Sequence, residues 1–412
     1  MSAVEILLLA ARLLGLFGIL AGVVLSLTWL ERKTLARIQL RVGPSLAGPH
    51  GTLQPIADAV KLVTKEDLTP AGSDKLLFWA APMLVFVPAF LVWVVIPFGA
   101  GEAMVVRALD LGLLYLVAIT SLGVVGLLMA GWASGGRYSM LGGLRAAAQL
   151  VSYEIPIVIT ILAVAVLVQS LSLDAVINGN TVTVGDRVFE LPGQNAIPFA
   201  LVMPLGAVIF FTAGLAEIGR TPFDIHHAES EVVGGPFLEY SGAHWAAFFL
   251  AEYLSTFVLA ALTAVLFFGG WSWPNPPESI FGTELPGAAT TGIGVVWFVF
   301  KAYLLSAVIF WIRGTFPRLR IDQLMTLAWQ GLIPLAFVNL FLAAATVYYQ
   351  WPWWGLTLVS LPPLAGAAFV IRRRRRGPAR GLTVTVYRKV TSESGRVVLA
   401  APPGSAAGER SA

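Results

Sequence analysis

The amino-acid sequence predicts an all-α, polytopic integral membrane protein. Of its 412 residues, 57% are hydrophobic and only 12% are charged, and this mixture cannot provide both a soluble core and a polar surface. Apolar runs long enough to cross about 30 Å of hydrocarbon recur along most of the chain. Positive charges gather in alternate loops between those runs, which is typical of a chain that crosses a membrane repeatedly.

The apolar runs predict about nine transmembrane helices. The first run lacks the basic start and the small-residue cleavage site of a signal peptide, so we expect it to be retained as a span. The last run is the least regular because Pro362 and Pro363 interrupt it. The predicted spans cover residues 4–30, 76–98, 110–132, 151–171, 197–217, 245–269, 290–312, 330–350 and 354–371.

The distribution of lysine and arginine predicts the orientation of these spans. With an external N-terminus, the inner loops hold thirteen Lys and Arg residues, whereas the outer loops hold two, Arg107 and Arg187. The excess of positive charge marks the cytoplasmic side. Residues 1–371 therefore form the predicted membrane domain. Residues 372–412, which begin with five arginines, are expected to be a disordered cytoplasmic tail anchored near anionic lipid.

Between the first two spans, the segment LQPIADAVKLVTKED at residues 53–67 predicts an amphipathic helix. Ile56, Val60 and Val63 recur at helical spacing, opposite Asp58 and two lysines. A helix with this pattern lies along the membrane interface. A simple surface helix accounts for the apolar face and leaves Asp58 unexplained.

The residue types exclude several kinds of bound group. The chain has no cysteine, so it cannot form disulfides, bind iron–sulfur clusters through thiolates or use thiol catalysis. Its four histidines leave little for a haem or a metal site. We therefore expect no metal site, and we expect any redox cofactor to belong to a partner.

Three glutamates lie within or at the ends of predicted spans, in the cytoplasmic half. Glu154 begins the fourth span, Glu217 ends the fifth, and Glu252 lies inside the sixth. Because a charge at depth is costly unless it is paired, hydrated or protonated, and because clustered carboxylates can share protons, the three predict a proton relay. For Glu154 and Glu217, an interfacial side chain is an equally good interpretation. Arg12 and Lys301 are expected to be structural counter-charges or to reach toward an interface.

The inner loop after the fifth span concentrates acidic residues. Residues 220–242 read RTPFDIHHAESEVVGGPFLEYSG and contain Asp224, Glu229, Glu231 and Glu239. The predicted orientation places this loop in the cytoplasm, between two apolar spans.

Long motifs lie in and beside the inner loops. They are ERKTLARIQLRVGPSLAGPHGTLQPIADAVKLVTKED, GWASGGRYSMLGGLRAAAQLVSYEIP, LAEIGRTPFDIHHAESEVVGGPFLEYSG, LAEY and WIRGTFPRLRIDQLM. These motifs resemble those of the H subunit of bacterial NADH:quinone oxidoreductase, respiratory complex I, and occur in the same order; the mitochondrial counterpart is NADH dehydrogenase subunit 1. The resemblance covers about residues 4–350 and leaves only the tail outside.

This resemblance implies a membrane subunit of a proton-translocating enzyme, without catalytic activity of its own. The subunit would line the tunnel by which a lipid quinone, ubiquinone or menaquinone, reaches the last iron–sulfur cluster, and it would begin the acidic path that couples quinone reduction to proton translocation. FMN and the iron–sulfur clusters would belong to partner subunits. The implied partners are the quinone-site and terminal-cluster subunits of the hydrophilic arm and adjacent small membrane subunits, in a bacterial inner membrane.

The resemblance also implies roles for individual residues. Positions that match quinone-tunnel or coupling residues of the family are Glu31, Arg32, Arg41, Asp58, Arg220, Asp224, Glu229, Glu231 and Glu239, and those that match the proton relay are Glu154, Glu217 and Glu252. Arg318 and Arg320 would hold the tunnel wall or a partner, although the positive-inside signal alone also accounts for them. Glu31 and Arg32 can alternatively form a local ion pair.

The chain departs from the family pattern at two places. His226 and His227 stand where the family commonly has a proline and a glutamate, so His227 either relays protons in place of the carboxylate or is a solvated loop residue. Gln330 follows Trp329 where a lysine is common, so the charge of that lysine cannot be transferred to this chain.

Two other functions are compatible with parts of the sequence. The equivalent subunit of a membrane-bound hydrogenase, or of a quinone reductase with another electron donor, would share this architecture, and its neighbouring subunits would distinguish it. A stand-alone proton-coupled transporter would also bury carboxylates, but it should show repeated halves around a midplane site. We find no internal repeat in this sequence.

Overall fold

The computed structural model describes residues 3–101, 104–184, 187–192, 194, 197–225, 233–274, 279–280, 283–284, 286–375, 388–391 and 397–400. The chain divides into two units, Met1–Leu364 and Ala365–Ala412. The second unit contains the end of helix α14 and a hairpin of β5 (Arg388–Thr391) and β6 (Val397–Ala400). The predicted disorder of the tail stays a prediction.

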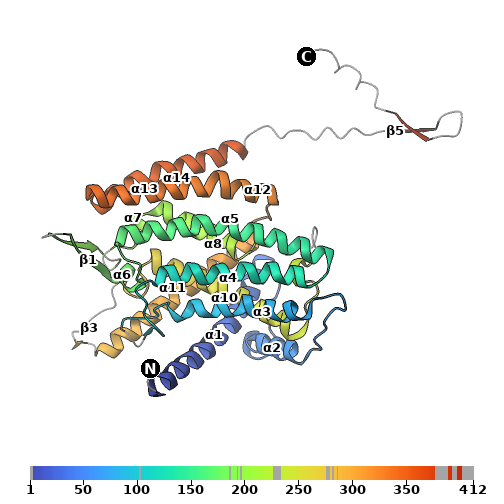
Figure 1. Ribbon diagram of the computed structural model, residues 1–412, viewed down its shortest axis with the longest axis horizontal. Helices are drawn as coiled ribbons and strands as arrows, with labels where there is room; N and C mark the ends of the chain where they lie inside the picture. The colour runs from blue at the N-terminus through green and yellow to red at the C-terminus, as the bar shows by residue number, and fades with distance from the viewer. Residues whose placement is uncertain are drawn as a thin grey trace, which may run out of the picture. The chain divides into compact units, whose positions relative to one another are not determined.

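The first unit is a bundle of long apolar helices (Figure 1). Within the described residues, seven helices are long and apolar enough to cross a membrane. They are α1 (Ala3–Ile38), α3 (Lys75–Leu91) continued by η2 (Val92–Val94), α4 (Gly112–Ala133), α5 (Arg137–Val168), α10 (Gly242–Phe267), α11 (Gly287–Thr315) and the continuous helix formed by α12 (Ile321–Thr326), η5 (Leu327–Leu332) and α13 (Ile333–Tyr349).

Two further predicted spans are helical but differ from these seven. The run at 197–217 is divided into α7 (Phe199–Val202) and α8 (Pro204–Glu217), because Pro204 has no N–H to continue the ladder and begins a new helix. The ninth run forms α14 (Trp353–Arg375), which keeps Pro362 and Pro363 inside it. The all-helical membrane fold is confirmed, and the number of nine transmembrane helices stays a prediction.

Shorter elements connect the long helices. Antiparallel hairpins of β1 (Gly179–Val184) with β2 and of β3 (Ser279–Ile280) with β4 lie at one end of the bundle, and α2 (Gln54–Thr64) lies at the other (Figure 1). This arrangement separates the predicted outer loops from the predicted inner ones. The remaining elements are η1 (Pro49–Gly51), α6 (Leu173–Asn178), β2 (Arg187–Pro192), η4 (Gly235–Phe237) and β4 (Thr283–Glu284).

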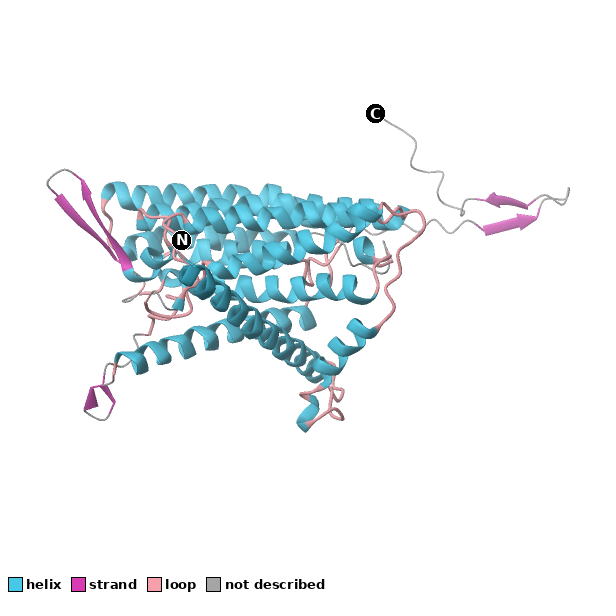
Figure 2. Ribbon diagram, turned by 60° about the horizontal axis from the view of Figure 1, so that its bottom comes forward, coloured by secondary structure: helices cyan, strands magenta, loops and turns pink. Residues whose placement is uncertain are grey.

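The helices pack side by side, and α1, which begins at the label N, crosses them obliquely (Figure 2). Among the seven long helices, α10 is the most buried. Large side chains such as Trp93, Phe257 and Phe298 are fully buried. Many other apolar side chains, including Leu14 and Phe341, lie exposed on the outside of the bundle. A helix surface with this composition is suited to lipid rather than water.

Helix α5 is longer than the predicted span at 151–171 because it begins at Arg137. Glycines in its first turns let it approach α4 and η4 closely. A Cβ atom on Gly143 would lie 3.0 Å from the Cα of Gly131, and one on Gly142 only 2.5 Å from the Cα of Gly235. Small residues at such contacts let helix backbones approach each other. The segment at 133–150, which was predicted as an inner loop, is therefore mostly helical, and α5 begins before the predicted span.

Candidate functional site

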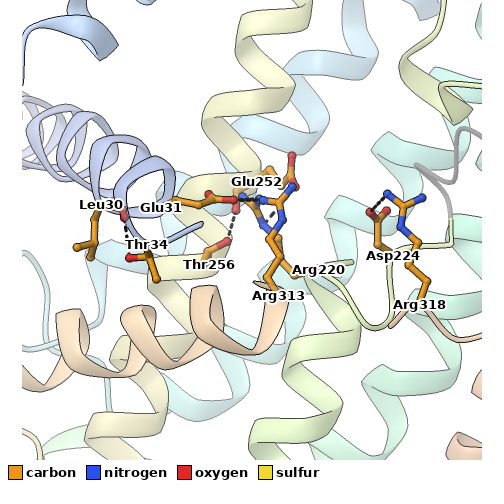
Figure 3. A network of polar contacts seen from close by, with 9 residues as sticks. All are labelled: Leu30, Glu31, Thr34, Arg220, Asp224, Glu252, Thr256, Arg313 and Arg318. Carbon is orange, nitrogen blue, oxygen red and sulfur yellow. Dashed lines mark hydrogen bonds and ion pairs between the residues drawn. The ribbon is translucent and has the colours of Figure 1, made fainter. Parts of the chain in front are cut away.

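A cluster of buried charges joins three helices and one loop at the inner end of the bundle. Glu31 of α1 is buried and forms ion pairs with Arg313 of α11 and with Arg220, which follows α8; its Oε1 lies 3.5 Å from Arg220 Nη1. Figure 3 shows these side chains converging. Glu31 therefore does not depend on a local pair with Arg32, and we call Glu31, Arg220, Arg313 and Glu252 the arginine cluster.

Arg220 is the centre of this cluster. Its guanidinium is buried, its Nε lies 3.3 Å from Glu252 Oε1, and its Cζ stacks 4.6 Å from the ring centroid of Tyr253. Burial lowers the pKa of Arg220, but the nearby carboxylates of Glu252 and Glu31 raise it more, so its pKa lies above the usual range. A buried charge of this kind is stable only with such partners.

Glu252 also belongs to a second group of acids, in the wall of a partly open cavity between helices. The cavity has a volume of about 160 Å³ and lies between α3, α4, α5, α8 and α10. Glu154, Glu217 and Glu252 all line it, in a wall that is otherwise mostly apolar. The three glutamates that the sequence predicts as a proton relay thus face one space. Through Glu252, that space is joined to the arginine cluster.

Asp224 lies beside the arginine cluster and pairs with a different arginine. Its Oδ2 is 3.2 Å from Arg318 Nη2, in the segment between α11 and α12 (Figure 3). A backbone hydrogen bond from the Leu319 N–H to the Pro222 carbonyl, 2.9 Å long, holds the same two segments together. Arg318 therefore has a specific partner, beyond a general contribution to the positive inner side.

The predicted amphipathic helix is present as α2, and it is tied to α1 by charge. Arg32 donates to Asp58 Oδ2 at 2.5 Å, and Gln54 donates to Asp58 Oδ1 at 3.2 Å. Burial raises the pKa of Asp58, but these hydrogen bonds and the charges of Arg32 and Lys61 together lower it by more, so the net pKa is below its ordinary value. Asp58, which a surface helix alone does not explain, anchors α2 to the end of α1.

Ile56, Val60 and Val63 are exposed on α2, with exposed fractions of 47%, 58% and 72%. The loop before α2 also exposes Leu40 and Leu46 almost completely. Apolar side chains gathered in this way form a surface that a lipid, a partner or an apolar ligand would cover. We call these five residues the apolar inner surface.

The remaining predicted site residues lie apart from these contacts. Arg41 is exposed and donates to Gln39 Oε1 at 2.7 Å. Arg320 is exposed just before α12. The side chain of Glu239 lies beside the start of α5, where a Cβ atom on Gly136 would be 3.3 Å from its Oε1. His226, His227, Glu229 and Glu231 lie outside the described residues.

The two basic residues within apolar helices have structural contacts. Lys301 of α11 is buried and donates its Nζ hydrogens to the carbonyls of Phe268, Gly270 and Trp273, just after the end of α10. A cation at this position complements the C-terminal end of the α10 dipole. Arg12 makes a long contact of 3.4 Å with the Val106 carbonyl.

Several residues of the site were missed by the sequence analysis. Arg313 belongs to the arginine cluster, Tyr253 stacks on Arg220, and Gln149 of α5 donates to two backbone carbonyls beside it. Gln149 and Arg313 are polar residues within or at the end of apolar helices, which is a signal of function or of polar packing. Tyr253 ends the LAEY motif, from which only Glu252 was predicted as a site residue.

Comparison with known proteins identifies related chains. A family model described as NADH dehydrogenase matches residues 11–344. The NADH-quinone oxidoreductase H subunit of Dehalococcoides mccartyi is 42% identical over 338 residues, which cover 82% of this chain and 86% of that protein. An H subunit of Syntrophobacter fumaroxidans, numbered 2 in that organism, is 43% identical over 351 residues, covering 84% of this chain and 97% of the relative. The H subunit of Granulibacter bethesdensis is 45% identical over 321 residues, 78% of this chain and 86% of that protein.

Proposed function

Because the chain belongs to the NADH dehydrogenase family, among the H subunits of NADH-quinone oxidoreductase, we propose that it lines the quinone tunnel of such a complex and forms the first acidic stage of proton coupling. It is a membrane subunit of a translocase and is not catalytic alone. FMN and iron–sulfur clusters would be held by partner subunits in the hydrophilic arm, and the complex would lie in a bacterial inner membrane.

One observation carries the coupling half of this proposal. Glu252 lines the cavity shared with Glu154 and Glu217, and it also lies 3.3 Å from Arg220 in the arginine cluster. Charges this close interact strongly where water is scarce. A change of protonation near Arg220 would therefore alter the proton affinity of the cavity carboxylates.

Unpartnered polar atoms support a role in proton movement. Among the described residues, Glu31 Oε2, Arg220 Nη2 and Asp224 Oδ1 are buried and have no hydrogen-bond partner. Buried polar atoms of this kind normally bind water or a ligand. Because Arg220 pairs with Glu252 in the cavity wall, such atoms would suit a hydrated path that leads to Glu217.

The apolar inner surface supports the tunnel half of the proposal. A quinone carries a polar head group on an isoprenoid chain, so its tunnel needs mostly apolar walls with a few polar groups. The exposed side chains of α2 and of the loop before it would supply such a wall once partner subunits cover the other side. Arg32 and Asp58 keep α2 attached to α1 there.

A photoreactive quinone analogue tests the tunnel assignment in the assembled complex. We expect light-dependent labelling of residues 40–63, reduced by excess natural quinone, while the outer hairpin at 179–192 serves as an unlabelled control. The coupling assignment is tested by Glu217→Gln and Glu252→Gln, which keep side-chain size but remove the titratable group. Each should retain NADH:ferricyanide activity and lose quinone-linked turnover together with proton pumping. Labelling that excess quinone does not reduce, or normal pumping in both variants, would refute the corresponding half.

A further inference from the structure

Gln149 is a fully buried amide to which neither the family resemblance nor the proposed path assigns a role. It lies on α5, five residues before Glu154, and only 1% of its surface is exposed. Its Nε2 donates to the carbonyl of Ala216 at 2.7 Å and to the carbonyl of Phe223 at 2.7 Å. Both hydrogens of the amide thereby bond to one segment, at two carbonyls that lie seven residues apart along the chain.

The chemistry of these contacts fixes the orientation of the amide. Backbone carbonyls only accept hydrogen bonds, so the NH₂ group must face Ala216 and Phe223. A carboxylate, a thioether or an alkyl group in the same place would leave both carbonyls without this donor. Because a buried carbonyl that loses a donor costs stability, this one amide contributes to holding both ends of the segment from Ala216 to Phe223 against α5.

This segment carries the residues that join the two parts of the site. Ala216 precedes Glu217 in the cavity wall, Arg220 lies in the middle, and Phe223 precedes Asp224, which pairs with Arg318. One side chain of α5 thus contacts the segment directly beside Glu217 and directly beside Asp224. The same helix places Glu154 in the cavity wall.

Capping of α8 accounts for only part of these contacts. The Ala216 carbonyl belongs to the last turn of α8 and also accepts from the Gly219 N–H at 3.2 Å, in a turn where Gly219 has a positive φ of 64°. A cap would need only the bond to Ala216. The second bond, to Phe223, lies beyond the helix end and fixes the far side of the loop.

We propose that Gln149 is a positioning residue that holds the arginine cluster and the cavity carboxylates in one fixed relationship. It acts through backbone carbonyls and does not itself carry protons. When a reaction near the loop at 218–225 displaces that loop, the two Gln149 hydrogen bonds displace Glu217 with it, relative to Glu154. This inference rests on the proposed function for its consequence, but its structural part stands alone.

Two substitutions with opposite pH behaviour test the inference in the purified complex. Gln149→Met keeps an unbranched side chain of similar length and removes both donors, so quinone-linked turnover should fall roughly fivefold or more at every pH. Gln149→Glu can donate one hydrogen bond only when protonated, so its turnover relative to wild type should recover as the pH falls from about 8 to about 5.5. Thr160→Val is the matched control, because buried Thr160 on the same helix bonds only the Pro156 carbonyl. It should behave as wild type.

Hydrogen exchange of the backbone amides at 218–225 gives a readout that is independent of proton coupling. In wild type, the N–H groups of Ile218, Gly219, Phe223 and Ile225 are hydrogen-bonded. We expect roughly tenfold faster exchange of this peptide in Gln149→Met, faster exchange in Gln149→Glu at about pH 8 than at about pH 5.5 after correction for intrinsic rates, and no change in Thr160→Val.

The outcomes separate this inference from the proposed function. Faster exchange in Gln149→Met, with normal pumping in Glu217→Gln, would support the positioning role and refute the relay. Unchanged exchange and turnover in both Gln149 variants would overturn the positioning role whatever the glutamate variants do. Failure of both Gln149 variants to assemble, while Thr160→Val assembles, would also overturn it, because Gln149 would then be required for folding.

Discussion

The Nε atom of Arg220 lies 3.3 Å from the Oε1 atom of Glu252, so the loop after α8 is joined to α10 at the wall of the cavity. The same guanidinium contacts Glu31 of α1. Residues from three separate parts of the chain therefore share one buried cation. In the proposed coupling, Arg220 is the residue through which an event at the inner surface would reach the cavity carboxylates.

Removal of the Arg220 charge should destabilise the subunit strongly. In Arg220→Met, Glu31 keeps only Arg313 and Glu252 loses its guanidinium partner, and breaking a buried ion pair in this way costs about 3–5 kcal/mol. We expect a lower thermal inactivation temperature of the purified complex and lost quinone-linked turnover. Asp174→Asn, an exposed substitution on α6 at the other end of the bundle, should change stability by less than about 0.5 kcal/mol. Equal thermal stability of the two variants would contradict the central role of Arg220.

The contribution of the Arg32–Asp58 pair to stability should be the same across the physiological pH range. The folded-state pKa of Asp58 is lowered below its ordinary value of 3.8, so its stabilising effect is complete above that value and is lost only as the pH falls through the lower folded pKa. Asp58→Asn should reduce quinone-linked activity by a constant factor between about pH 5.5 and about pH 8, no more than about fivefold for a partly exposed pair. An activity ratio that varies with pH over this range would show that Asp58 titrates.

Lys301 should be required for stability and dispensable for proton transfer. In Lys301→Met, three carbonyls beyond α10 lose their donor, and we expect the complex to lose about 2–4 kcal/mol of stability. Thr263→Val, which removes a buried hydroxyl bonded within α10, is the control and should have a much smaller effect. Pumping per quinone reduced, measured in the complexes that assemble, should equal that of wild type. A lower ratio would assign Lys301 to the proton path.

Single-cysteine labelling should verify the membrane orientation, because the native chain contains no cysteine. Cysteines at positions 187 and 284 should react with an impermeant maleimide from outside, and those at 318, 320 and 374 only from inside. The excess of Lys and Arg in the inner loops is the physical reason for this orientation. Outside labelling at 320 would reverse it, and outside labelling at 374 would remove the ninth span.

The helices could be predicted because each depends on local composition. Apolar runs of sufficient length predicted all the long helices, and the helical spacing of Ile56, Val60 and Val63 predicted α2. The division between α7 and α8 was not predicted, because a proline can begin a helix, as Pro204 does, or lie inside one, as Pro362 does in α14. The extension of α5 back to Arg137 was not visible in hydrophobicity, because it depends on close packing of glycines against neighbouring segments.

The partners of the charged residues could not be predicted from local sequence. Glu31 pairs with Arg313, which is 282 positions away, while its neighbour Arg32 pairs with Asp58. The separation of Arg41 from the cluster has a local cause. Helix α1 ends at Ile38, Leu40 just beyond it has a positive φ of 54°, and the Leu40 and Arg41 N–H groups donate to the carbonyls of Arg37 and Ala36. Glycine is the usual residue at this position beyond a helix end, so the leucine at position 40 did not indicate the turn.

The most direct test of the account is proton pumping in the double variant Glu217→Gln, Glu252→Gln. NADH:ferricyanide activity, NADH:quinone activity and pumping should be measured in the same membrane vesicles, because the first reports assembly upstream of the quinone. If the cavity carboxylates couple quinone reduction to proton movement, ferricyanide activity will be normal, and quinone turnover and pumping will fall together by at least about tenfold. Normal quinone turnover with normal pumping would contradict the account and leave Glu217 and Glu252 as structural residues.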